Sequence, residues 1–127
     1  MLYEDALSLV EDVQWHHTFE IYPNIVTSGV YNPSFLYDKL NLQDVAGKTI
    51  ADIGASNGYY SLQLAKAGAK VVAFDYRHED CSGFSIMKKL NSLDINHHQV
   101  NVLDGGIADI YPEKFDVGNR CQVFTFN

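Results

Sequence analysis

The chain has 127 residues, of which 46% are hydrophobic and 20% charged, and its formal net charge is −7. This length suits one domain with a single core, and no apolar run approaches the ~20 residues of a transmembrane helix. The negative charge excludes broad binding to a nucleic-acid backbone, which needs clustered lysine and arginine. It allows a local basic patch or a small anionic ligand.

The compartment is indicated by the N-terminus and the cysteines. The first residues carry Glu4 and Asp5 and have no basic region, so they do not resemble a secretory signal peptide. Cys81 and Cys121 lie far apart without a disulfide-framework or metal-binding spacing. Free thiols and no export signal predict a cytoplasmic protein.

The N-terminal part is predicted to form a helix, an extended segment and a second helix. Apolar residues recur at helical spacing through residues 1–15. Residues 15–33 have no helical period and are rich in aromatic and β-branched residues, so we expect an extended or loop segment. Asn32 and Pro33 then form a good helix start. The buried face of this second helix would carry Phe35, Leu36 and Leu40.

From residue 48 onward, strands and helices alternate. Residues 48–54 predict a buried strand, and a helix is expected from about Gly58 to Ala67, stopped by Gly68. Residues 69–75 are almost continuously apolar, as in a parallel strand that is covered on both faces.

The pattern continues to the end of the chain. Asp80 or Ser82 could cap a third helix, and residues 98–104 predict a third strand. Residues 113–127 predict one or two short strands, interrupted at Gly118. The alternation predicts a doubly wound, Rossmann-like α/β fold with a mostly parallel sheet. Ligands of such sheets bind at the carboxyl ends of the strands.

The segment ADIGASNGYYS, residues 51–61, can be compared with three nucleotide-binding loops. A P-loop is excluded, because Leu42 replaces its first glycine and residues 47–49 precede a strand instead of following one. The dinucleotide fingerprint is disfavoured, because Ser56 and Tyr59 stand where two of its glycines are required.

The third comparison agrees better. Residues 52–58, DIGASNG, resemble the first motif of the class I S-adenosylmethionine (SAM) methyltransferases, with Ser56 in place of the middle glycine. The resemblance implies that Asp75 binds the ribose hydroxyls and that Asp104 lies against the adenine amino group. Taken singly, each acid could instead have only a local capping role. The resemblance assigns SAM binding to Asp52, Gly54, Ala55, Ser56, Asn57, Gly58, Tyr59, Asp75, Tyr76, Asp104 and Gly105.

A narrower resemblance covers about residues 15–117. The segment WHHTFEIYPNIVTSGVYNPSFLYDKL and the strand–loop–helix after it are similar to the methyltransferase group related to the tRNA wobble-uridine carboxymethyltransferases. A lysine of that group falls at His16, so plain SAM is expected instead of carboxy-SAM. The resemblance implies that residues 1–47 form helices and a lid over a SAM-binding core of residues 48–127, in one compact domain. Candidates to close the lid are Trp15, Phe19, Tyr22 and Tyr31.

The same family continues through further strands, so the resemblance implies a C-terminally incomplete sheet whose fourth strand is an exposed edge. Such an edge invites pairing with another copy or a partner chain. We therefore predict a methyltransferase that acts on an RNA or small-molecule acceptor. The alternative is a non-catalytic or truncated SAM-binding protein that works through oligomerisation or a partner chain.

No catalytic residue follows from the pattern. The His16-His17 and His97-His98 pairs lack an acid or cysteine at ligand spacing, so no metal site is expected. Residues that remain possible general bases are His16, His17, Tyr31 and His78.

Overall fold

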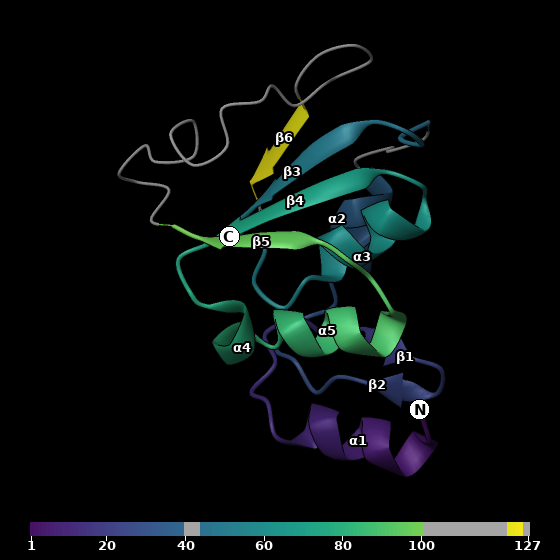
Figure 1. The fold of residues 1–127 in the computed structure, drawn as a ribbon. Coiled ribbons are helices and arrows are strands. Elements are labelled where there is room, and N and C mark those ends of the chain that lie inside the picture. The colour runs from purple at the N-terminus through teal and green to yellow at the C-terminus, as the bar shows by residue number, and fades with distance from the viewer. Residues whose placement is uncertain (40–43, 101–121, 126–127) are drawn as a thin grey trace.

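The computed structural model describes residues 1–39, 44–100 and 122–125 (Figure 1). Its elements in chain order are α1 (Tyr3–Glu11), β1 (Glu20–Tyr22), β2 (Ile25–Val26), α2 (Ser34–Lys39), β3 (Thr49–Ile53), α3 (Tyr59–Lys66), β4 (Lys70–Asp75), α4 (Glu79–Ser82), α5 (Phe84–Asn91), β5 (Asn96–Gln99) and β6 (Gln122–Thr125). None of the described helices is long and apolar enough to cross a membrane.

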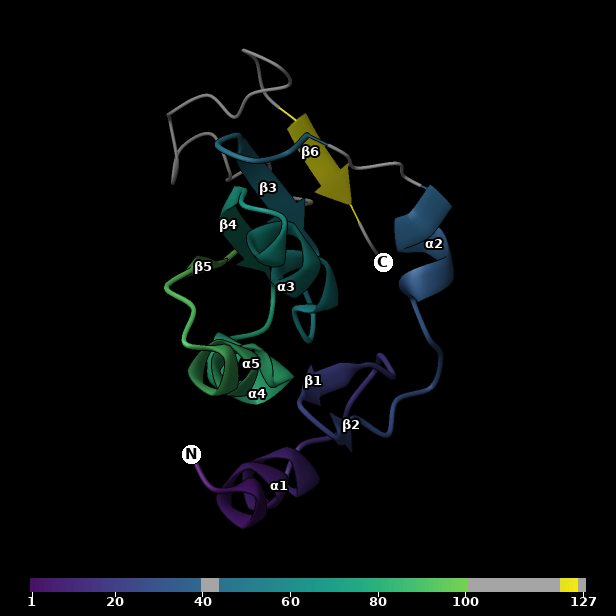
Figure 2. The same cartoon turned by 90° about the vertical axis from the view of Figure 1, so that its right-hand side faces the viewer.

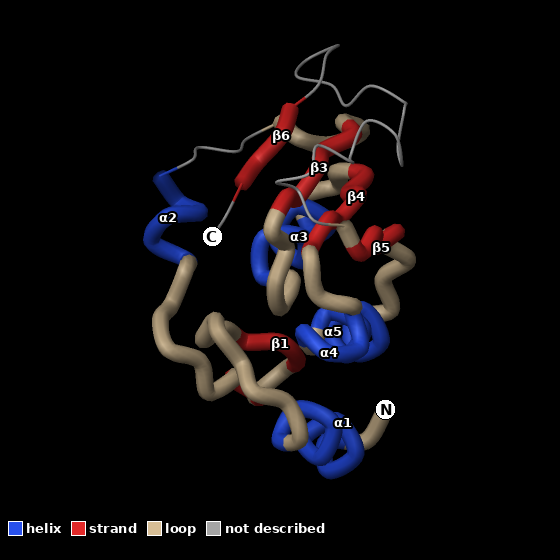
Figure 3. Tube along the Cα trace, turned by 90° about the vertical axis from the view of Figure 1, so that its left-hand side faces the viewer, coloured by secondary structure: helices blue, strands red, loops and turns tan. Residues whose placement is uncertain are grey.

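The main sheet has four strands in the order β5-β4-β3-β6 (Figure 3). All its pairs are parallel. Asp52 of β3 lies opposite Ala73 of β4 on one side and Phe124 of β6 on the other. The predicted parallel α/β fold is confirmed. Since β4 and β5 lie on one side of β3 and β6 on the other, the strand order reverses next to β3, where open α/β sheets bind their ligands.

The extended N-terminal segment contains a small antiparallel sheet of its own. Strands β1 and β2 pair around Asn24, which takes the left-handed backbone conformation at φ 67°. This pair and α1 pack against α5, below the main sheet in Figure 2. One core cluster contains side chains from α1 and from β3, such as Ala6 and Ile50, so residues on both sides of position 47 share a hydrophobic core.

Several helix boundaries follow the sequence pattern. The Asn32 side chain accepts a hydrogen bond from the Ser34 amide at 2.9 Å, which confirms the predicted start of α2. Helix α3 ends before Gly68, whose φ of 93° suits a residue without a side chain. The side chains of Phe35 and Leu36, and the whole of Leu40, lie outside what the structure describes.

The predicted third helix differs, because it divides into α4 and α5 at Gly83. Gly83 has a φ of 86°, and a Cβ there would lie 2.8 Å from Cζ3 of Trp15. Neither predicted cap starts α4: His78 does so, accepting a hydrogen bond from the Asp80 amide. Ser82 lies at the end of α4, and its hydroxyl oxygen accepts a hydrogen bond from the Phe84 amide at the start of α5, at 3.4 Å, which agrees with the predicted capping by Ser82.

The third and fourth strands of the sheet are also shifted from their predicted ranges. Strand β5 covers Asn96–Gln99, ahead of the predicted residues 98–104, of which 101–104 lie outside the described residues. A short C-terminal strand is confirmed as β6, while the stretch around Gly118 is likewise not described.

Candidate functional site

The glycine loop leaves β3 at the carboxyl edge of the sheet and is bonded to the neighbouring strand. The amides of Gly54 and Ala55 both donate to the carbonyl oxygen of Phe74, at 2.8 and 3.0 Å. Gly54, Ser56 and Gly58 all have positive φ, at 75°, 51° and 91°. The backbone therefore takes the left-handed conformation at all three positions where the motif has glycine. At Ser56 this conformation is strained, because the residue has a Cβ.

Gly58 is required mainly for packing between helices. A Cβ at this position would lie 2.6 Å from Cε of Met87 and 2.9 Å from Cδ2 of Phe84. The start of α3 thus approaches α5 closely only because residue 58 has no side chain. The last glycine of the motif therefore allows the end of the loop to pack closely against Met87 and Phe84 of the core.

Asp75 ends β4, directly beside the loop. The residue is 6% exposed. Burial raises the pKa of its carboxyl, although the backbone amides of Tyr76 and Ser56 and the charge of Arg77 oppose this shift. The structure therefore brings the predicted ribose-binding acid and the middle of the glycine loop together.

Asp52 is fully buried in β3. Its Oδ2 accepts a hydrogen bond from the Ser61 hydroxyl of α3 at 2.7 Å, and burial raises the pKa of its carboxyl to about 6. Its Oδ1 has no hydrogen-bond partner among the described residues. A buried carboxylate oxygen without a donor costs free energy, which a ligand N–H group would recover. Ser61 did not emerge from the motif, since its role depends on where α3 turns back over β3.

The Asn57 side chain has a different position from the one expected for a ligand contact. Its Oδ1 accepts hydrogen bonds from the amides of His16 and His17, at 2.7 and 2.9 Å. Its Nδ2 donates to the carbonyl oxygen of Ser82 at 2.6 Å. Asn57 is 1% exposed and links three chain segments, so its side chain is occupied within the protein.

The aromatic residues after the loop are largely internal. Tyr59 and Tyr60 are 6% and 1% exposed, and burial raises the pKa of each hydroxyl to about 12. Tyr59 packs edge-on against Phe19 and Tyr37. Tyr76, by contrast, is 70% exposed at the end of β4.

Other predicted site residues are placed as follows. Ala55 is buried in the loop. Asp104 and Gly105 lie outside the described residues, so their predicted contacts with the adenine ring stay predictions. Among the described residues, no group of three or more His, Cys, Asp or Glu side chains could hold a metal ion.

The lid candidates separate into two kinds. Trp15 and Phe19 are core residues that meet in a T-shaped contact, and the hydroxyl of Tyr22 donates to the carbonyl oxygen of Met1. Tyr31 is 37% exposed, and its hydroxyl oxygen lies 3.0 Å from Nε2 of His17, whose amide is bonded to Asn57 of the loop. The sequence named His17 as one of several possible bases and Tyr31 as a possible base and a lid candidate, but it did not pair them.

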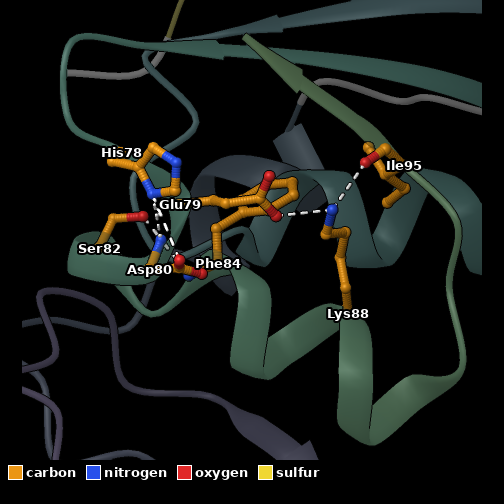
Figure 4. Close-up of polar contacts among 7 residues, drawn as sticks. All are labelled: His78, Glu79, Asp80, Ser82, Phe84, Lys88 and Ile95. Atoms are coloured by element: carbon orange, nitrogen blue, oxygen red, sulfur yellow. Dashed lines mark hydrogen bonds and ion pairs between the residues drawn. The ribbon is translucent and has the colours of Figure 1, made fainter. Parts of the chain in front are cut away.

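The histidine at position 78 has a structural role. Its Nδ1 accepts from the Asp80 amide at 3.1 Å and caps α4, as Figure 4 shows. The same figure shows the ion pair between Glu79 and Lys88 at 2.6 Å, and Lys88 also donates to the carbonyl oxygen of Ile95. These contacts join α4 to α5 and to the start of β5, away from the glycine loop.

Comparison with known proteins supports the resemblance in sequence and in fold. No family model matches the chain. The parallel sheet with its glycine loop is the fold of class I SAM-dependent methyltransferases, and the chain is similar in sequence to members of that class. Over 79 residues it is 32% identical to the tRNA U34 carboxymethyltransferase of Campylobacter lari, covering 60% of the chain and 25% of that protein.

A second relative is equally similar. The ubiquinone biosynthesis O-methyltransferase of Hydrogenovibrio crunogenus is also 32% identical over 79 residues, covering 59% of the chain and 30% of that enzyme. The chain thus spans less than a third of the length of either relative.

Solved structures agree on the fold. The chain superposes on a SAM-dependent methyltransferase from Listeria monocytogenes with a TM-score of 0.51 at 23% identity, over 72% of the chain and 38% of that structure. It superposes on WbdD, a bifunctional kinase-methyltransferase, with a TM-score of 0.60 at 17% identity, over 80% of the chain and 25% of that structure.

Proposed function

We propose that this protein binds SAM at the carboxyl edge of its sheet and transfers the methyl group to an acceptor. The observation that carries the proposal is the pairing of two features at one edge: the left-handed turns of residues 54–58 and the buried acid Asp75 beside them. The similarity to a tRNA U34 carboxymethyltransferase and to a ubiquinone biosynthesis O-methyltransferase supports transfer of a methyl or substituted methyl group and leaves the acceptor open.

The residues present suit this donor. Asp75 can accept hydrogen bonds from two ribose hydroxyls, because a carboxylate offers several lone pairs. Oδ1 of Asp52 lacks a donor among the described residues, and SAM carries an ammonium group that can supply one. SAM itself provides the activated methyl carbon. The protein contributes mainly by holding donor and acceptor in line, which is worth several orders of magnitude in rate.

Isothermal titration calorimetry with S-adenosylhomocysteine tests donor binding. Asp75→Ala should weaken binding at least tenfold, because two hydrogen bonds to a charged acceptor are lost. Asp94→Ala is the matched control, since Asp94 is exposed and lies in the turn before β5. A wild-type protein that binds neither S-adenosylhomocysteine nor SAM would disprove the proposal.

The remaining parts of the assignment are predictions with tests of their own. Plain SAM is expected as the donor, and an RNA or small molecule as the acceptor. Pairing of two copies through β6 should appear as a dimer in native mass spectrometry. A cytoplasmic location should appear in fractionation. The rival function, SAM binding without transfer, would be refuted by transfer of labelled methyl from SAM to any component of a cell extract.

A further inference from the structure

A histidine–tyrosine pair beside the glycine loop has no role in donor binding. Nε2 of His17 and the hydroxyl oxygen of Tyr31 are 3.0 Å apart, and the two residues face each other in a parallel bridge. His17 is 2% exposed and Tyr31 is 37% exposed. The pair therefore connects a buried imidazole to a phenol at the surface.

The backbone places this pair firmly against the loop. The His17 amide donates to Oδ1 of Asn57 at 2.9 Å, and the Thr18 amide donates to the carbonyl oxygen of Tyr31 at 2.8 Å. The two segments cross closely at Gly29, where a Cβ would clash with the backbone of His17. Pair and loop thus form one rigid arrangement, which is what a group acting next to the methyl donor requires.

The imidazole is free to exchange a proton with Tyr31. Nδ1 of His17 is buried and has no hydrogen-bond partner among the described residues, so Tyr31 is the polar group that its ring engages. Burial, and to a smaller extent His16, lowers the pKa of His17 to about 4. The ring is therefore neutral near pH 7 and has a lone pair to offer.

The surroundings of the pair are aromatic, and the charges near them are negative. The ring of His17 meets those of Tyr31, Tyr59 and Tyr60 nearly edge-on, at centroid distances of 5.0, 6.4 and 6.1 Å. No lysine or arginine among the described residues shifts the pKa of His17, Tyr59 or Tyr60. Among the described residues, the ionisable groups next to the pair are His16, Tyr59 and Tyr60, and those next to Tyr59 and Tyr60 are Tyr37, Asp38 and Asp52.

This environment selects the acceptor. Asp38 and Asp52, whose charges help to raise the pKa of Tyr59 and Tyr60, would repel a carboxylate or a phosphate, and no lysine or arginine among the described residues shifts the pKa of either ring. A neutral amine attacks a methyl group without prior loss of a proton, whereas a hydroxyl is a poor nucleophile that needs a base. A base beside these acidic groups therefore suits a small, neutral hydroxyl compound.

We propose that Tyr31 is a catalytic residue that takes the proton of a neutral hydroxyl acceptor while it passes its own proton to Nε2 of His17. The inference rests on the proposed methyl transfer. The acceptor oxygen attacks the methyl carbon, a C–O bond forms, and the C–S bond breaks with its electron pair left on sulfur. The positive charge lost from the sulfonium then passes to the imidazolium of His17, a form that burial disfavours and that is therefore short-lived. The imidazolium then returns its proton to Tyr31, a residue that is 37% exposed, and Tyr31 releases a proton to solvent.

The test uses the full chain, with catechol as the neutral hydroxyl probe and benzoate as its anionic counterpart. With radiolabelled SAM, the wild type should methylate catechol and not benzoate. Tyr31→Phe keeps the ring and removes the hydroxyl, so it should lower kcat about a hundredfold while changing the affinity for S-adenosylhomocysteine less than twofold. Its rate should keep rising with pH as hydroxide deprotonates catechol, whereas the wild-type rate should level off. Tyr3→Phe, an exposed tyrosine of α1, should behave as the wild type.

A second measurement does not depend on turnover. Catechol added to the protein loaded with S-adenosylhomocysteine should shift the ¹⁵N resonances of the His17 ring, and Tyr31→Phe should abolish that shift. Suppose that S-adenosylhomocysteine binds, but that catechol is not methylated and does not shift the ¹⁵N resonances of the His17 ring. The inference is then overturned and the donor assignment stands, and the same holds if only an RNA is methylated. If S-adenosylhomocysteine does not bind, the proposed function fails and this inference fails with it.

Discussion

Asn57 should contribute more to stability than its small side chain suggests. Asn57→Ala removes one acceptor and one donor from a site that is 1% exposed. The amides of His16 and His17 and the carbonyl oxygen of Ser82 then lose their partners inside the protein. Leaving a buried polar group unpaired costs about 1–3 kcal/mol. We expect the free energy of unfolding to fall by about 3–5 kcal/mol, since local relaxation and water recover part of the sum.

Urea denaturation followed by far-ultraviolet circular dichroism measures this change. The free energy of unfolding of a domain is typically roughly 5–15 kcal/mol, so a loss of this size is a large fraction of the total. The urea concentration at the midpoint of unfolding should therefore fall sharply, while the dependence of the free energy on urea concentration stays constant. Asn96→Ala is the matched control, because Asn96 is exposed in β5, and it should change stability by less than about 0.5 kcal/mol. An Asn57→Ala protein as stable as the control would show that the three hydrogen bonds do not join these segments.

Three further substitutions separate packing from charge. Gly58→Ala and Gly47→Ala both place a side chain at positive φ, but only at Gly58 would the Cβ meet Met87 and Phe84. Thermal unfolding should therefore show that the folded state loses about 3 kcal/mol of stability in Gly58→Ala and about 1 kcal/mol in Gly47→Ala. Equal losses in the two variants would refute the packing role of Gly58. Asp52→Asn tests the buried carboxyl. Because folding raises the pKa of Asp52 from 3.8 to about 6, the neutral carboxyl stabilises the folded state. This contribution to the free energy of unfolding is fully present below pH 3.8 and is lost as the pH rises through about 6. Relative to the wild type, Asp52→Asn should gain about 2–3 kcal/mol between pH 4 and pH 8 and yet bind S-adenosylhomocysteine more weakly, whereas a pH-independent difference would show that Asp52 is not buried as a charge.

The features that sequence predicted well are those set by local chemistry. Strand β4 was recognisable because residues 71–74 are all apolar and all buried, as expected for a central parallel strand. The loop after β3 was recognisable because glycine and serine stand where the backbone needs positive φ. In both cases the cause lies within the segment itself.

The features that sequence missed depend on contacts between distant segments. The division of the third helix at Gly83 follows from the position of the Trp15 ring. The role of Asn57 follows from the path of residues 16 and 17, which no periodicity describes. Likewise, His17 stands out from the other histidines only once the bridge to Tyr31 is formed.

The hydrogen bonds of Asn57 also couple the conformation of the glycine loop to that of the N-terminal segment, so stabilising one stabilises the other. If a ligand stabilises the loop around Asn57, the same free energy must protect the amides of His16 and His17, which the loop holds. Conversely, a molecule that binds to residues 15–31 would change the affinity of the loop for its ligand without contacting the loop. Under the proposed function, the N-terminal segment would then influence the affinity of the loop for its ligand.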